Sequence, residues 1–230
     1  MSFNESPEVK AFKSASTDRA LWRLTQRGHT ANTIIDVGAS NGMWSAVTEQ
    51  YLPDAEYLLI EAQECHREAL DAYCQSRPKA QYTLSAAGAK PGDFIYFDDG
   101  SPFGGLASET ETEYTKVKVP VTSIDAEVEK LDLPGPYLVK LDTHGFEVPI
   151  LEGAKETLKN ASILVIEVYN FKITPDSLLF WEMCVYLDKL GFSPADLSEP
   201  LWRTRDQAFW QMDLIFIPKS SPEFEYIHYA

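Results

Sequence analysis

Residues 33–42 read TIIDVGASNG, and this stretch decides how the rest of the chain is interpreted. Its first five residues, Thr33 to Val37, form a short apolar run rich in β-branched side chains, which is typical of a buried strand. Gly38 and Gly42 then bracket small residues, and such a turn lets a ligand approach the backbone closely. A helix after the turn would point free backbone N–H groups at that ligand. The stretch therefore predicts a strand, a ligand-binding turn and a helix.

The same order of apolar strand and amphipathic helix recurs along the chain. Further strands are predicted at residues 57–60, 81–85, 137–142, 162–168 and 212–217. Helices are predicted at residues 7–27, 40–51, 64–76, 147–158 and 175–190. Apolar, β-branched strands that alternate with helices favour a parallel sheet covered on both faces. Since crossovers in such sheets are right-handed, a doubly wound α/β sandwich is the economical topology.

The middle of the chain departs from this alternation. Residues 94–97 and 116–121 are predicted strands on either side of a polar loop that contains glycine. We expect a single domain over residues 1–230, with an N-terminal helical extension at residues 1–30 and an inserted hairpin and loop at residues 92–122. Because long loops are often functional, the insert is a candidate lid over a bound substrate.

The amino-acid composition limits the kinds of partner that the protein can bind. The 230 residues carry 20 Lys+Arg against 35 Asp+Glu, a net charge of −15 at pH 7. Nucleic acids and anionic membrane surfaces need cationic footprints, so we expect neither as a partner. The apolar runs fall far short of the roughly 20 residues that cross a bilayer. The N-terminus lacks a secretory pattern, and three cysteines without CxxC spacing fit a reducing compartment, so we expect a cytoplasmic protein without structural zinc. A homo-oligomer is left open.

Polar residues follow the predicted strands, at the edge where open α/β sheets bind ligands. Glu61 comes directly after the second strand, where a carboxylate can accept hydrogen bonds from ribose hydroxyls. The turn at residues 38–42 does not match GxGxxG, because the second and third glycine positions hold Ser40 and Met43. A pyrophosphate-containing dinucleotide is therefore disfavoured.

A denser polar group follows the strand at residues 137–142. Asp142, His144 and Glu147 lie together there, and Glu167 ends the most apolar strand. Such groups can supply a general base, anchor a substrate hydroxyl or hold a cofactor. Structural roles are an alternative to these functional ones. Asp142 could cap the N-terminus of a helix, and Glu147 could interact favourably with the helix dipole. A carboxylate at the end of an apolar strand, such as Glu167, is costly unless it has a partner.

Three segments resemble class I S-adenosylmethionine-dependent methyltransferases. Residues 34–42 resemble their first motif, and residues 59–61 resemble their acidic second motif. More specifically, residues 139–154, VKLDTHGFEVPILEGA, resemble the K-hydrophobic-D-x-x-G-x-E-x-x-(I/L)-L-x-G-A signature of the FkbM-type methyltransferases. The sequence departs from the family at Ala62, where proline is usual, and at His144, where a smaller or acidic residue is common.

The resemblance implies a Rossmann-like, mostly parallel seven-stranded sheet with helices on both faces and an antiparallel last strand, for which residues 214–217 are suited. It implies O-methylation of a hydroxyl on a sugar, glycan or secondary metabolite, with S-adenosylmethionine as cofactor. The first motif would line the methionine end of the cofactor, Glu61 would hold the ribose, and Ser85 and Ala86 would lie by the adenine. The cofactor-binding residues that it implies are Asp36, Gly38, Ala39, Ser40, Asn41, Gly42, Glu61, Ala62, Ser85, Ala86 and Asp142.

The catalytic group that we expect comprises Asp142, His144 and Glu167. A hydroxyl nucleophile must lose a proton near the moment of attack, and Asp142 or His144 would take it while Glu167 orients the acceptor. No metal is assigned, but a divalent cation held by Asp142, Glu167 and Asn170 is an alternative, because oxygen ligands suit Mg²⁺. Two other functions stay open: a binding module that keeps the fold without the chemistry and, less favoured, an NAD-dependent oxidoreductase.

Overall fold

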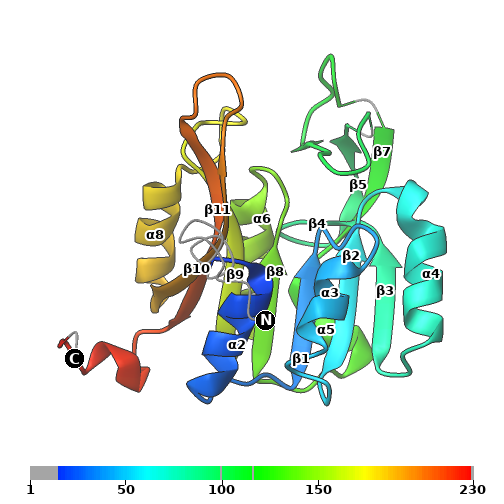
Figure 1. Cartoon of the computed structure of the whole chain (residues 1–230). Coiled ribbons are helices and arrows are strands. Elements are labelled where there is room, and N and C mark those ends of the chain that lie inside the picture. Colours follow the sequence, from blue (N-terminus) through cyan, green and yellow to red (C-terminus); the bar gives the residue numbers. More distant parts are fainter. Residues whose placement is uncertain (1–14, 99, 116, 229–230) are drawn as a thin grey trace, which may run out of the picture.

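The structure is a computed structural model that describes residues 15–98, 100–115 and 117–228. Its larger sheet has seven strands in the order β10-β11-β9-β8-β1-β2-β3 (Figure 1). These strands are β1 (Thr33–Val37), β2 (Glu56–Glu61), β3 (Ala80–Leu84), β8 (Tyr137–Leu141), β9 (Ala161–Tyr169), β10 (Phe192–Trp202) and β11 (Phe209–Pro218). Strands β3, β2, β1, β8 and β9 pair in parallel, whereas β11 runs antiparallel to both β9 and β10. The predicted antiparallel last strand is confirmed.

Helices cover both faces of the larger sheet. One face carries α2 (Thr17–Gln26), α3 (Met43–Thr48) and α4 (Arg67–Gln75), and the other carries α5 (Ile124–Leu131), α6 (Glu147–Glu152), α7 (Lys155–Leu158) and α8 (Phe180–Lys189). Successive strand residues feed opposite cores, because side chains alternate across a strand: Ile34 packs with α2, and Ile35 packs under α5 and α6. The predicted doubly wound architecture is therefore confirmed.

Three predicted helices are shorter than expected. The helix expected at residues 40–51 covers only Met43–Thr48. The helix expected at residues 147–158 ends at Glu152, and α7 begins only after Gly153 and Ala154. The helix expected at residues 175–190 begins at Phe180. Before it, the Ser177 hydroxyl accepts hydrogen bonds from the backbone N–H groups of Ile173 and Thr174, and such local bonds compete with helix formation. The first residues of the predicted 7–27 helix lie outside the described residues.

One strand of the larger sheet is absent from the sequence-based prediction. No strand is predicted at residues 192–202, but they form β10, at the edge of the larger sheet. Pro194 and Pro200 hid this strand, since proline is poorly suited to a strand except at an edge. Helix α2 packs on β10, and the Arg23 guanidinium donates to both carboxylate oxygens of Asp196 at 2.8 Å.

The two strands predicted in the insert belong to a separate sheet. It has four strands in the order β4-β7-β5-β6: β4 (Ala86–Ala87), β5 (Gly92–Phe97), β6 (Ala107–Ser108) and β7 (Val117–Thr122). Strand β4 follows β3 almost directly and pairs in parallel with β7. This connection holds the small sheet above the carboxyl edge of the larger sheet (Figure 1). No described helix combines the length and the apolar character that a bilayer crossing requires.

Gly153→Ala is expected to lower the free energy of unfolding by about 1–3 kcal/mol. A Cβ at this position would lie 2.0 Å from the Gly88 carbonyl oxygen and 3.0 Å from the Ser123 Cβ, so backbone would have to move. In a chain of this size each kcal/mol lowers Tm by roughly 2–4 °C, which calorimetry measures. The matched control is Gly92→Ala, whose Cβ would meet nothing within 4 Å. Equal Tm values for the two variants would contradict this packing argument.

Candidate active site

A cavity of about 320 Å³ opens at the carboxyl edge of the larger sheet. This volume is within the range of about 300–1,000 Å³ for small-molecule sites. Residues from the ends of β1, β2, β3, β8 and β9 line it, together with residues of the small sheet. The predicted site residues that line the cavity are Gly38, Ser40, Glu61, Ala62, Ser85, Ala86, Asp142, His144 and Glu167. The order of the strands in the sheet thus brings together residues that lie more than 100 positions apart in the sequence.

Four predicted cofactor residues do not line the cavity: Asp36, Ala39, Asn41 and Gly42. Asp36 is fully buried below the turn, where it accepts a hydrogen bond from the Ser45 hydroxyl at 2.7 Å. The Asn41 side chain accepts from the Met43 backbone N–H, and Gly42 precedes α3 with a left-handed φ of 78°. These residues therefore support the backbone of the turn on the side that faces away from the cavity.

The sequence reading did not single out several residues that line the cavity. Gln63 and Thr143 directly neighbour predicted site residues, so their positions carried a usable signal. Phe97 lies in the insert that was predicted as a lid, but no motif marked this residue. Gln211 carried no signal, because it comes from the antiparallel strand β11. Gln211 reaches the site because β11 pairs with β9 in a register that sets Gln211 opposite Tyr169.

The turn after β1 requires glycine at position 38. Gly38 has a φ of 73°, and a Cβ there would lie 2.0 Å from the Asp142 carbonyl oxygen. The ends of β1 and β8 therefore touch through their backbones, and this close approach is possible only without a side chain.

The Glu61 carboxylate is fixed at the end of β2. One oxygen accepts the Ser40 backbone N–H and the other accepts the Gln63 backbone N–H, each at 2.7 Å. Because each carboxylate oxygen has a second lone pair, Glu61 can still accept hydrogen bonds from hydroxyl groups in the cavity. The side chain that was predicted to hold a ribose is thus aimed and held rigid by the turn.

A buried lysine links the turn to the polar group after β8. The Lys140 ammonium lies 3.2 Å from Asp36 Oδ1 and 3.3 Å from Asp142 Oδ2, and it donates to the Gly38 carbonyl at 3.1 Å. Burial alone would lower the pKa of Lys140, but the Asp142 and Asp36 carboxylates raise it above its ordinary value. Burial would likewise raise the pKa of Asp142, yet the Lys140 charge holds it below its ordinary value. Both groups are therefore charged at neutral pH.

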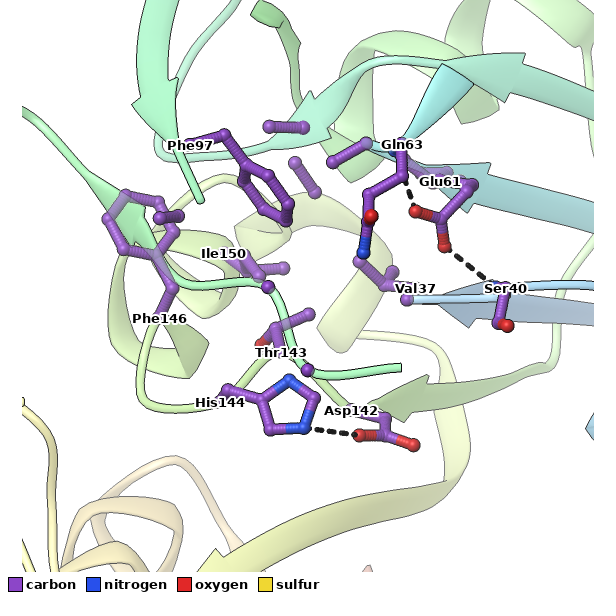
Figure 2. A pocket seen from close by; sticks show the side chains of 18 of the residues that line it. Val37, Ser40, Glu61, Gln63, Phe97, Asp142, Thr143, His144, Phe146 and Ile150 are labelled. Atoms are coloured by element: carbon purple, nitrogen blue, oxygen red, sulfur yellow. Dashed lines mark hydrogen bonds and ion pairs between the residues drawn. The ribbon is translucent and has the colours of Figure 1, made fainter. Parts of the chain in front are cut away.

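His144 lies between two carboxyl groups. Its Nε2 is 3.9 Å from Asp142 Oδ1 (Figure 2) and 3.8 Å from Glu167 Oε2. The backbone at His144 is left-handed, with a φ of 51°, and Gly145 follows with a φ of 96°. Glu147 stabilises this bend by accepting the Gly145 N–H at 2.8 Å and the Thr143 hydroxyl at 3.1 Å. Glu147 therefore has a structural role in the loop that carries His144.

The three titratable groups differ in protonation. Burial lowers the pKa of His144, although the Asp142 charge opposes the shift, so the imidazole is neutral at pH 7. Burial and the neighbouring Asp142 carboxylate raise the pKa of Glu167 above its ordinary value. Tyr169 and Gln211 donate hydrogen bonds to Glu167. The arrangement thus offers an ionised acid, a neutral base and a protonated acid within one corner of the cavity.

The same three residues are the described group that could hold a metal ion. Asp142, His144 and Glu167 each offer one ligand atom, and these atoms lie within 4.8 Å of one another. This set contains a histidine instead of Asn170, whose amide donates to the Phe209 carbonyl at 3.3 Å. The Lys140 ammonium beside Asp142 opposes a second positive charge at this place.

The fold and the cavity together define a class. Five parallel strands, an antiparallel last strand and a site at the carboxyl edge constitute the Rossmann-like architecture of class I methyltransferases. The family described as "Methyltransferase FkbM domain" matches residues 36–194, and the chain belongs to this family. No curated protein matches the chain in sequence.

Solved structures resemble the chain at low identity. Methyltransferase FkbM from Methylobacillus flagellatus KT has a TM-score of 0.53 and 18% identity, over 80% of this chain and 43% of that one. This chain therefore corresponds to less than half of that protein, and the likeness shows a shared fold alone. A putative O-methyltransferase from Klebsiella pneumoniae has a TM-score of 0.49 and 13% identity, over 95% of this chain and 83% of that one.

Lys140→Met is expected to lower the free energy of unfolding by about 3–5 kcal/mol, because the fully buried Asp36 carboxylate loses its cation, which it shares with the partly exposed Asp142. Adding Asp36→Asn should recover part of this loss, since one of the stranded charges is then removed. Urea unfolding of the two single variants and the double variant measures the coupling as a double-mutant cycle. Strictly additive free energies would contradict a direct Lys140–Asp36 interaction.

Proposed function

We propose that the chain transfers a methyl group from S-adenosylmethionine to a hydroxyl oxygen of a sugar, glycan or secondary-metabolite acceptor. Family membership supports methyl transfer. The observation that carries the finer proposal is the shared cavity: a fixed carboxylate, Glu61, lines one part of it, and a neutral imidazole, His144, lines another. A hydroxyl nucleophile needs a base of this kind, whereas a dinucleotide would need the glycine pattern that the turn lacks.

The residues of the cavity fit S-adenosylmethionine. Glu61 would accept the ribose hydroxyls, and the small side chains of Ala62, Ser85 and Ala86 leave space for the adenine. Gly38 and Ser40 would lie along the methionine end. When bound, the cofactor supplies a methyl group activated by a sulfonium cation, and the ionised Asp142 would complement this positive charge.

His144 would accept the proton of the acceptor hydroxyl at Nε2. The imidazole is neutral at pH 7, so it is already in the form that accepts a proton. The Asp142 carboxylate, 3.9 Å away, would stabilise the imidazolium that results. Glu167, which keeps its own proton, would orient the acceptor by hydrogen bonding. Alignment of the hydroxyl oxygen with the methyl group can contribute about 7–11 kcal/mol in favourable cases.

The charge, the insert and the cysteines bear on the acceptor, the domain organisation and the location of the protein. A net charge of −15 suits a small or glycosidic acceptor rather than a nucleic acid. We propose that residues 1–230 act as one domain and that the insert at residues 92–122 covers the acceptor. The three cysteines form no disulfide, which supports a cytoplasmic location.

S-Adenosylhomocysteine, the demethylated product, is expected to raise Tm. A ligand at about 100 Kd adds ~2.7 kcal/mol to the free energy of unfolding. Glu61→Gln should weaken this ligand about tenfold or more, because hydrogen bonds to a charged acceptor are stronger. Glu64→Gln is the matched control, because the Glu64 side chain is 71% exposed and pairs with Arg67. Calorimetric titration gives the affinities, and a shift with NAD(H) alone would overturn the proposal.

His144→Asn is expected to lower kcat by about 10²–10⁴ while cofactor affinity stays near the wild-type value. Asparagine tolerates the left-handed backbone at this position, so the loop should keep its shape. Since burial lowers the pKa of His144, activity of the wild type should fall only below the ordinary histidine pKa of about 6.5.

The control for His144→Asn is Glu167→Gln. Glu167 keeps its proton at neutral pH, so a neutral amide of the same shape should retain most of the activity. Both variants are compared by mass spectrometry of methylated product across hydroxylated acceptors between pH 5 and 8. If His144→Asn turns over an acceptor as fast as the wild type does, His144 is not part of the mechanism.

A further inference from the structure

Phe97 brings an aromatic ring into the cavity from outside the larger sheet. It is the last residue of β5, its side chain is buried, and its ring points into the cavity (Figure 2). The ring packs in a small apolar cluster with Ala86, Ile95 and Val119, and Ala62 lies against that cluster. Ala62 and Ala86 follow β2 and β3, so Phe97 faces the part of the cavity next to Glu61.

Residues 102–105 also line the cavity. We call residues 100–106 the roof loop. The Gln63 amide donates to the Ser101 carbonyl at 3.1 Å, and the His66 Nε2 contacts the Pro102 carbonyl at 2.7 Å. At the base of the roof loop the Asp98 N–H donates to the Leu106 carbonyl at 2.9 Å. The roof loop is therefore tied to the segment that directly follows Glu61.

Gly105 sets the position of the ring. A Cβ on Gly105 would lie 2.2 and 2.3 Å from two carbons of the Phe97 ring and 2.8 Å from the Asp98 carbonyl oxygen. A side chain at position 105 would therefore push the ring or the loop away. The absence of a side chain lets the roof loop pack directly on the Phe97 ring, which lines the cavity.

Position and chemistry together limit what the ring can recognise. A flat aromatic face packs best on another flat, weakly polar face, as a nucleobase offers. The ribose-binding role proposed for Glu61 sets the base of the same nucleoside near Ala62 and Ala86, where Phe97 lies. The polar group of Asp142, His144 and Glu167 comes from other strands, β8 and β9, whereas Ala62 and Ala86 beside the ring follow β2 and β3.

We infer that Phe97, held in place by Gly105 and the roof loop, forms the wall on which the adenine base of the cofactor packs. This inference rests on the proposed function, because it takes S-adenosylmethionine as the ligand. It assigns Phe97 and the roof loop to cofactor binding and leaves the rest of the insert as the proposed cover of the acceptor. Phe97 is then a binding residue that the strand-end motifs do not include.

Calorimetric titration of the full chain with S-adenosylhomocysteine and with 5′-methylthioadenosine tests the inference. Phe97→Leu keeps an apolar side chain in the cluster but removes the aromatic face. It should weaken both ligands by a similar factor of about 10, because base–aromatic packing contributes that order of affinity and both ligands carry adenine. Gly105→Ala should weaken both ligands in the same way by displacing the ring.

The matched control is Phe94→Leu. Phe94 lies on the same strand, but it is 41% exposed and packs with Tyr96 and Lys118 outside the cluster, so both affinities should stay unchanged. Tm values of the ligand-free variants check that each one folds. Wild-type affinity in folded Phe97→Leu would overturn the inference while the proposed function stands. Failure of the wild type to bind either ligand would instead overturn the proposed function itself.

Discussion

The buried Lys140 ammonium is the interaction on which the site depends. It joins the Asp36 carboxylate inside β1, the Gly38 carbonyl in the turn and the Asp142 carboxylate after β8. A charge this deeply buried is stable only with partners of opposite charge and good geometry. Lys140 therefore fixes the distance between the two central strand ends, and the turn that would receive the cofactor takes its position from that contact.

The same ammonium orders the charges across the cavity. Burial raises the pKa of Glu167, and the charge of Asp142, which the ammonium keeps ionised, raises it further, so Glu167 holds its proton. His144 stays neutral through burial. Burial and this cation together leave an ionised Asp142, a neutral His144 and a protonated Glu167, the groups that the proposed methylation of a hydroxyl would use.

The chain order of the elements was predictable because its signals are local. Apolar β-branched runs predicted the six strands of the larger sheet apart from β10, and the small-residue turn and the signature at residues 139–154 indicated the site edge. These local sequence signals failed where contacts with residues distant in the sequence decide the structure. Strand β10 carries two prolines, which strands tolerate at a sheet edge, and the helix predicted at residues 147–158 breaks at Gly153, where the Gly88 carbonyl leaves no room for a side chain.

The sequence by itself determined the fold class and the residues that stand at the carboxyl ends of the strands, because hydrophobic period and turn chemistry are properties of short segments. Only the tertiary structure decided which of those residues share a cavity. Asp36 and Gly42 belong to the turn motif yet lie behind it, whereas Phe97 and Gln211 enter from an added sheet and an antiparallel strand. Protonation of Glu167 and His144 was also beyond the sequence, since it arises from burial and from charges on other strands.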